Sequence, residues 1–160
     1  MNIFFLDPHP NVAASYLCDK HVVKMGIESA QMLSTAHWSN GGSAPYKRTH
    51  TNHPSTIWAR ASTNNYDWLV KHAFSILDEY EKRYGRRHKT RSVVEWLDLH
   101  RPDLPVAAFT LPPQCMPDAY KREDTVDAYR AFYAVEKIAG LGLSYAKAQS
   151  RPEWLGYYIG

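Results

Sequence analysis

Apolar residues return every three or four positions over several long stretches of the chain, which is the spacing of an α-helix. The longest stretch predicts a helix from Val12 to about Trp38. A second helix is expected from near Pro54 to Gly85, with room for a break at residues 63–65. Shorter helices are expected over residues 92–100 and 124–138. Helix is therefore the dominant predicted element.

Two further segments complete the predicted architecture. Residues 102–117 carry five prolines, so we expect an irregular, ordered crossing there rather than a helix. Residues 1–6 are apolar and short enough to form a single strand. A chain of 160 residues is most simply one domain, spanning residues 1–160. The predicted fold is all-α, a compact bundle of three to five helices.

The most informative pattern is a stripe of polar side chains on the first predicted helix. Steps of three and four residues place its members on one side of that helix: Cys18, His21, Lys24, Glu28, Gln31 and Thr35. An acid, an imidazole and an amine in one cleft can perform proton transfer or amine chemistry. The alternative is an ordinary amphipathic helix in which Lys24 and Glu28 form a surface pair, with Asp19 pairing close by.

Positive charge is clustered, although the formal net charge is only +3. The basic residues that we expect to contact the phosphates of a polyanion such as DNA are Lys47, Arg48, Arg86, Arg87, Lys89, Lys121 and Arg151. Such clusters are typical of proteins that bind a polyanion. Solvated helix ends and loops explain any one cluster equally well.

Several classes of protein and site are excluded or disfavoured. Cys18 and Cys115 make no disulfide framework, and no run of about 18 apolar residues predicts a membrane span. We expect a cytoplasmic protein, in the host cytoplasm if it is phage-encoded. A metal site at His50 and His53, completed by His37 or Cys18, lacks a second close pair of ligands. We therefore expect no metal and no cofactor.

Two segments resemble a known family, the phage pyrimidine-dimer DNA glycosylases, also called endonuclease V. In the first, the family's Leu, Asp, His and Glu recur at the same offsets as Leu17, Asp19, His21 and Glu28. In the second, the family's tail pattern is matched by Arg151, Pro152, Trp154, Tyr157 and Tyr158. The resemblance implies an all-α protein that bends duplex DNA and turns a base out of the stack, because an enzyme cannot reach C1′ inside a closed duplex.

The resemblance also implies roles for individual residues. In the family the N-terminal α-amine attacks C1′ and forms a Schiff base, while a Glu stabilises the developing positive charge. Glu28 takes that role here, with His21 beside the sugar-phosphate and Asp19 in the same group. The candidate amines are the α-amine of Met1 and the side chain of Lys24. The residues that we expect to form a base pocket are Gln31, Asn64, Trp68 and Tyr120.

Three features depart from the family pattern. The family's mature N-terminus is a small residue exposed by removal of the initiator Met, whereas Asn2 leaves Met1 in place. Two arginines that hold phosphates in the family correspond here to Ile27 and Gln31. The chain before His21 is also longer. These departures bear on the reaction more than on the fold or the DNA partner.

Three functions are therefore weighed, with double-stranded DNA as the expected partner and the oligomeric state open. The leading hypothesis is a base-flipping DNA glycosylase/AP lyase that removes a damaged or modified pyrimidine through an amine Schiff base. The alternative is a phage transferase that attaches an amine or amino acid to an activated 5-hydroxymethyluracil in DNA. The third is a non-catalytic module that binds nucleic acid through its basic clusters and aromatic side chains.

Overall fold

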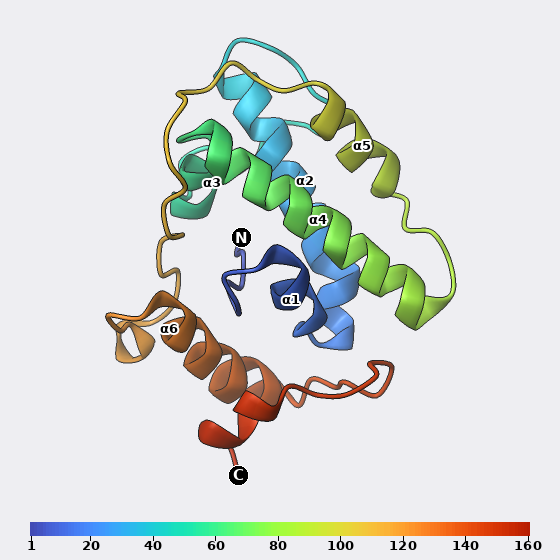
Figure 1. Ribbon diagram of the computed structural model, residues 1–160, viewed down its shortest axis with the longest axis vertical. Helices are drawn as coiled ribbons and strands as arrows, with labels where there is room; N and C mark the ends of the chain where they lie inside the picture. Colours follow the sequence, from blue (N-terminus) through green and yellow to red (C-terminus); the bar gives the residue numbers. More distant parts are fainter.

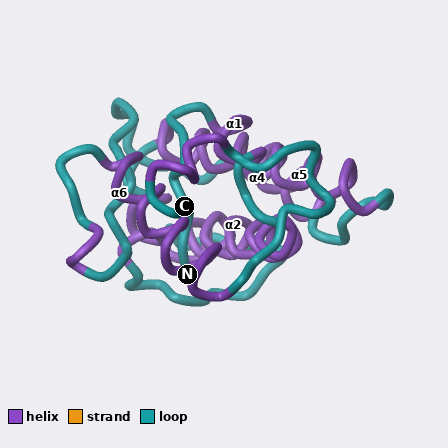
Figure 2. Tube along the Cα trace, turned by 90° about the horizontal axis from the view of Figure 1, so that it is seen from below, coloured by secondary structure: helices purple, strands orange, loops and turns teal.

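Six α-helices joined by loops and short helical turns make up the chain. The computed structural model describes all 160 residues and contains no strand (Figure 2). The helices are α1 Pro10–Ser15, α2 Asp19–Ser39, α3 Pro54–Ala59, α4 Thr63–Tyr84, α5 Arg91–Leu99 and α6 Thr125–Phe132. The 3₁₀ turns η1 Asp118–Tyr120 and η3 Glu153–Tyr157, and the π-helical η2 Tyr133–Ala139, complete the set. The predicted all-α class is confirmed, and no helix is long and apolar enough to cross a bilayer.

The helix number exceeds the predicted range because each of the two long predicted helices is divided. The continuous helix expected from residue 12 is wrong: Cys18 is extended, and its N–H donates to the Tyr133 hydroxyl at 2.9 Å. This long-range bond closes the α1–α2 corner. The second break lies just ahead of residues 63–65, where the Ser62 side chain caps α4 by accepting from the Asn65 N–H at 3.1 Å.

Helices α2 and α4 cross in close contact, with α4 in front in the view of Figure 1. Gly26 of α2 makes the close approach possible. A Cβ atom at this position would lie 3.0 Å from Cδ2 of Leu77, which is fully buried on α4. The helix-weakening glycine in the middle of α2 is thus explained by packing.

The first six residues lie inside the molecule, and the N-terminus is central in Figure 1. Ile3, Phe4, Phe5 and Leu6 are all buried, but they form an extended segment and no strand. Because Phe4 stacks on His21 and the Asn2 N–H donates to Glu28, the segment runs antiparallel to α2. Phe4 has a φ of 52°, which costs about 1–2 kcal/mol in a non-glycine residue.

The proline-rich crossing contains no helix between α5 and η1, as predicted, and side chains from α3 and α4 fasten it. The indole of Trp58 donates to the carbonyl of Thr110 at 2.8 Å, and the Asn64 amide donates to that of Ala107 at 2.8 Å. Farther along, the Asn2 amide donates to the carbonyl of Cys115 at 3.0 Å. The crossing is therefore tied to the N-terminal segment.

One arginine connects the ends of three helices. The Arg83 side chain is 2% exposed and donates to the carbonyls of Ser15 and Leu17 at 3.1 and 2.7 Å. It also pairs with the carboxylates of Asp19, at 3.3 Å, and Glu79, at 3.0 Å. The end of α1, the start of α2 and the last turns of α4 are thus held by one guanidinium.

We predict that Arg83→Met lowers the free energy of unfolding by about 3–5 kcal/mol, because two carboxylates lose a nearly buried partner. The matched variant is Lys82→Met. Its side chain is 68% exposed and lies 3.6 Å from Glu79, so its loss should cost less than about 1 kcal/mol. Urea unfolding of both variants measures the difference, and equal effects would contradict the role given to Arg83.

Candidate active site

Successive turns of α2 place the polar stripe in different surroundings. At the N-terminal end His21 is 6% exposed, stacks on Phe4 with 4.8 Å between ring centroids, and has Nδ1 2.7 Å from the Tyr133 hydroxyl. At the other end, the Thr35 hydroxyl donates to the carbonyl of Thr49 at 3.0 Å. Only the middle turns, with Lys24, Glu28 and Gln31, have polar stripe side chains that reach solvent.

Burial decides the protonation of His21. Desolvation lowers the pKa of His21 to about 4, and the positive charges of Lys137, Lys24 and Lys20 lower it in the same direction. The imidazole is therefore neutral at neutral pH. It packs between the N-terminal segment and η2 and offers little surface to a substrate.

Glu28 lies where two amines meet. Its side chain is 13% exposed, and Oε1 accepts the Asn2 N–H at 3.1 Å. The α-amine nitrogen of Met1 is 3.7 Å from the same oxygen, and Nζ of Lys24 is 3.7 Å from Oε2. The structure thus brings together Glu28, Met1 and Lys24, three of the residues predicted from the sequence.

The two amines are held in different ways. The Met1 side chain is 2% exposed although the residue as a whole is only half-buried, so its accessible surface belongs to the main-chain end. Asn2 fixes that end, because its amide donates to Cys115 and its Oδ1 accepts the Phe4 N–H at 2.8 Å. Lys24 is 60% exposed on a flexible stem. Met1 is the better-oriented amine.

Two hollows border this group. The first, which we call the His53 hollow, has a volume of about 510 Å³ and is lined by His53, Pro54, Pro113, Gln114, Cys115, Met116 and Lys121. The second, the Gln31 hollow, measures about 360 Å³ and is lined by Ile27, Gln31, Pro45, Tyr46, Lys47 and Thr49. Cys115 connects the first to Asn2, and Ile27 and Gln31 flank Glu28 along α2. The group around Glu28 therefore adjoins one residue or more of each lining.

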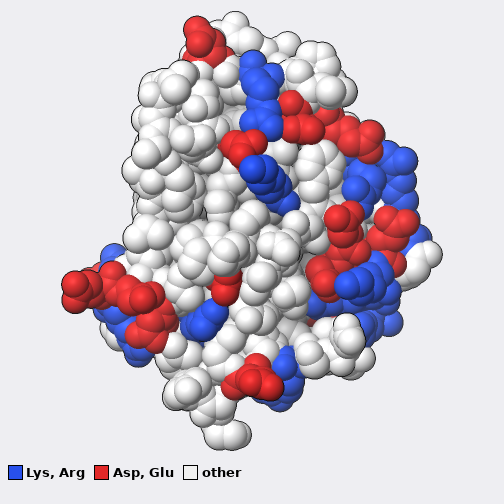
Figure 3. Space-filling view, viewed as in Figure 1, with Lys and Arg blue, Asp and Glu red and all other residues white.

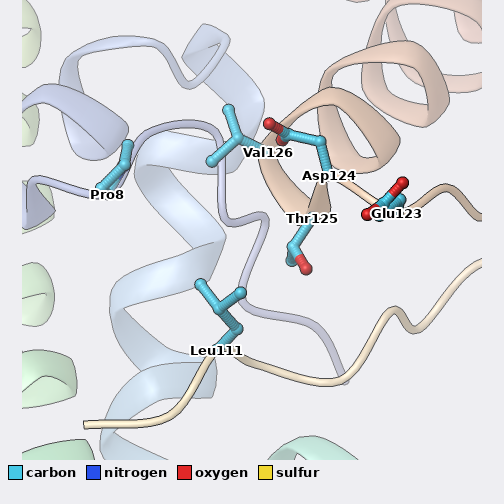
Figure 4. Close-up of a pocket in the computed structure, with 6 residues that line it drawn as sticks. All are labelled: Pro8, Leu111, Glu123, Asp124, Thr125 and Val126. Carbon is cyan, nitrogen blue, oxygen red and sulfur yellow. The ribbon is translucent and has the colours of Figure 1, made fainter.

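A third hollow, of about 500 Å³, lies at the start of α6 (Figure 4). Its lining contains the carboxylates of Glu123 and Asp124 and no Lys or Arg. Like charges repel, so this hollow is unsuited to a phosphate or to DNA. The candidate site is the Met1–Glu28 group with the two hollows beside it.

A family model described as pyrimidine dimer DNA glycosylase matches residues 1–92 of the 160. The chain belongs to this family. The matched part includes α1 to α4, hence Met1, Glu28 and His53, whereas the tail pattern at residues 151–158 lies outside it. No curated protein and no solved structure gives a significant match. Family membership supports a function of the DNA glycosylase type and DNA as the partner.

In this glycosylase-family chain, four of the predicted site residues lie apart from Glu28 or are engaged elsewhere. Asp19 accepts from Arg83 and from the Lys147 N–H at 2.9 Å, about 13 Å along α2 from Glu28. The Trp68 indole donates to the carbonyl of Pro8 at 2.9 Å, and Asn64 fastens the crossing. The hydroxyl of Tyr120 donates to Glu136 at 3.0 Å. Gln31 lines the hollow named after it.

The predicted DNA-contacting residues are similarly divided. Lys47 and Lys121 each line one of the two hollows, although Lys121 also lies 2.9 Å from Asp118. The other five lie outside both hollows. Arg48 donates to the carbonyl of Trp38, Arg86 to the hydroxyl of Tyr80 and Arg87 to the carboxylate of Glu95. Lys89 and Arg151 are exposed and form no ion pair. Two of the seven are thus beside the candidate site.

Charge is distributed unevenly over the molecule. From residue 20 to residue 66 the basic residues are Lys20, Lys24, Lys47, Arg48 and Arg60, and Glu28 is the single acid. On the face formed by α4 and α5, acids and bases alternate, as Figure 3 shows, and they pair: Asp67–Lys71, Asp78–Arg91, Glu95–Arg87 and Asp98–Arg101. The segment that contains Glu28 therefore has the larger excess of positive charge and is the more suitable for phosphates.

His53 is the site residue that the sequence argument missed. Its place directly before Pro54 and its spacing from His50 indicate a helix start or a metal ligand, and neither indicates a catalytic site. Burial lowers the pKa of His53, the Met1 amine and His50 lower it further, and Glu28 opposes them. These neighbours are distant in sequence from His53, apart from His50, so no local pattern indicates their proximity. No cluster of three or more His, Cys, Asp or Glu side chains is arranged to hold a metal ion.

The neutral state of His21 predicts a pH-dependent stability. Because the folded state binds its proton only near pH 4 and the unfolded state near pH 6.5, stability falls as the pH drops from 6.5 towards 4. We expect His21 to account for a loss of about 2 kcal/mol between pH 7 and pH 5. Urea unfolding of His21→Phe should show a pH dependence smaller by that amount. An unchanged dependence would contradict the burial of a neutral His21.

Proposed function

We propose that this chain is a DNA glycosylase/AP lyase in which the α-amine of Met1 attacks C1′ of a nucleotide turned out of the duplex. The observation that carries the proposal is the position of that amine, 3.7 Å from Oε1 of Glu28 and beside a hollow of about 510 Å³. An amine and a carboxylate at one opening supply the nucleophile and the counter-charge that this reaction requires.

The chemistry follows from these two groups. The unprotonated amine forms a bond to C1′, while the glycosidic bond breaks and the base leaves with its electron pair and gains a proton. Ring opening then gives a cationic Schiff base, next to which the Glu28 carboxylate is stabilising. Loss of a proton from C2′ expels the 3′-phosphate by β-elimination, and water releases the sugar fragment from the enzyme.

Met1 is favoured over Lys24 as the nucleophile because it is preorganised. The cost of ordering an attacking group is smaller when folding has already fixed it. Met1 is anchored by its buried side chain and by the hydrogen bonds of Asn2, whereas Lys24 would have to be ordered from a 60% exposed chain. Lys24 instead supplies positive charge on the outer side of Glu28.

The two hollows support the extrusion of a nucleotide towards this amine. Their linings combine apolar surface with Lys47 on one side and Lys121 on the other. Positive side chains at the rim suit the phosphates that flank an everted nucleotide. The family's phosphate-binding arginines are replaced by Ile27 and Gln31, so these loop lysines provide the charge here.

The nucleophile can be tested by borohydride trapping on a duplex that carries an abasic site or a pyrimidine dimer. We predict a covalent adduct on the peptide that contains Met1, located by mass spectrometry. Glu28→Gln should lower the rate of adduct formation at least about 100-fold, because the carboxylate assists proton transfer and stabilises the charge. Lys24→Arg keeps the charge without the primary amine and should still form the adduct.

Two further results bear on this proposal. A removable peptide placed before Met1 should abolish trapping until it is cleaved off, because the extension displaces the amine from Glu28. An adduct on Lys24 would contradict the choice of amine. A changed mass of the base without strand scission would favour the transferase. If no reaction occurs and Glu28→Gln leaves DNA binding unchanged, the non-catalytic module is favoured.

The DNA-binding face makes a separate prediction. Lys47→Ala should weaken duplex binding and reduce the slope of log K against log salt by about 0.9, the value for one phosphate contact. The matched variant is Lys71→Ala, on α4, where the side chain is 65% exposed and lies 2.8 Å from Asp67. It should leave the slope unchanged. Equal slopes for the two variants would contradict the orientation proposed here.

A further inference from the structure

His53 is held in one orientation by the start of α3. It is the N-cap residue of that helix, and its Nδ1 accepts the Ser55 N–H at 3.1 Å. A nitrogen that accepts a hydrogen bond carries no proton, so the neutral ring has its proton on Nε2. Nε2 makes no hydrogen bond within the chain, and His53 lines the hollow beside the Met1 amine. A fixed donor without a partner thus lies at the hollow.

The groups that face His53 come from four parts of the chain. They are the Met1 amine of the N-terminal segment, Glu28 of α2, His50 of the preceding loop, and Lys121 of the same hollow. Lys121 is itself paired with Asp118. Glu28 is already engaged by Asn2, Met1 and Lys24. The lining of the hollow, which contains no carboxylate, therefore offers an anion two donors, His53 and Lys121.

His53 and His21 differ in availability. His21 is 6% exposed, stacked on Phe4 and beside the Tyr133 hydroxyl. His53 is half-buried, and one of its nitrogens is free. Of these two histidines, only His53 can donate to a substrate without a rearrangement of the core.

We propose that His53 contacts the substrate directly, its Nε2–H donating a hydrogen bond to an oxygen of a phosphate that flanks the everted nucleotide. The inference rests on the proposed function, since it uses the same hollow and the same DNA strand. A neutral imidazole held by α3 orients the phosphate next to the reacting sugar, and Lys121 of the same lining adds positive charge. This contact takes over part of the phosphate binding that Ile27 and Gln31 cannot provide.

The test combines a variant of the protein with a variant of the DNA. His53→Asn keeps a good N-cap for α3 but withdraws the donor from the hollow. His50→Asn, at an exposed residue whose ring bonds to the Thr49 hydroxyl, is the matched control. Duplexes carry an abasic site with either a natural phosphate or a neutral methylphosphonate beside it. Borohydride trapping rates and duplex affinity are both measured.

We expect His53→Asn to lower the trapping efficiency on natural DNA about 10- to 100-fold, the usual effect of a lost hydrogen bond to a charged group. For the wild type, a methylphosphonate at one position should lower the trapping efficiency by a similar factor. For His53→Asn, the same methylphosphonate should lower the efficiency little further, because the contact is already lost. The His50→Asn variant should respond like the wild type. Each rate is compared at several substrate concentrations, so that KM and kcat are separated.

Several outcomes would overturn the inference. One is that His53→Asn traps DNA as well as the wild type does. Another is that, at every phosphate position, the loss in trapping efficiency from His53→Asn and the loss from the methylphosphonate multiply, which means that the two groups act independently. If the wild type traps nothing, the proposed function fails instead. In that case the affinities for natural and methylphosphonate duplexes still decide whether His53 makes the contact, because they require no covalent step.

Discussion

The site depends on the burial of the chain's first six residues along one edge of α2. Chain ends are usually frayed and solvated. Here the apolar side chains of Ile3 to Leu6 are packed into the core, and the charged terminus that they carry is delivered to Glu28. The same packing holds Phe4 at a positive φ. Hydrophobic burial of four large side chains, at about 1.5–3 kcal/mol each, exceeds that strain.

This packing also gives the polar stripe of α2 two different roles. Phe4 and Tyr133 cover His21, so its imidazole is neutral and contributes to the core. About two helical turns farther along α2, the segment reaches Met1, and the Glu28 side chain stays partly open to solvent. A single extended segment thus determines which turn of the helix is covered and which stays open to solvent. The covering of His21 and the partial exposure of Glu28 are two consequences of the path of this segment along α2.

Much of this architecture could be predicted from the sequence, and the failures have physical causes. Helical periodicity gave the all-α class, and spacing placed Lys24 and Glu28 on one edge. The break at Cys18 was missed because it depends on Tyr133, 115 residues away. Likewise, the burial of His21 requires Phe4 and Tyr133, neither of which is its neighbour in sequence. Periodicity identifies the face of a helix but not what covers each turn of it.

His53 shows the same limit in a functional residue. Its local pattern, a histidine before Pro54, correctly indicates the start of a helix. Because Nδ1 caps α3, the ring is fixed and Nε2 is left without a partner. The same side chain can therefore cap the helix and line the hollow. In the proposed site, this position compensates for the departures at Ile27 and Gln31. No arginine lies on α2, and we assign phosphate binding to two donors of the His53 hollow, His53 before α3 and Lys121 after η1. The proposed site would therefore keep the nucleophile and the carboxylate of the family, while the groups that bind phosphate come from other segments of the chain.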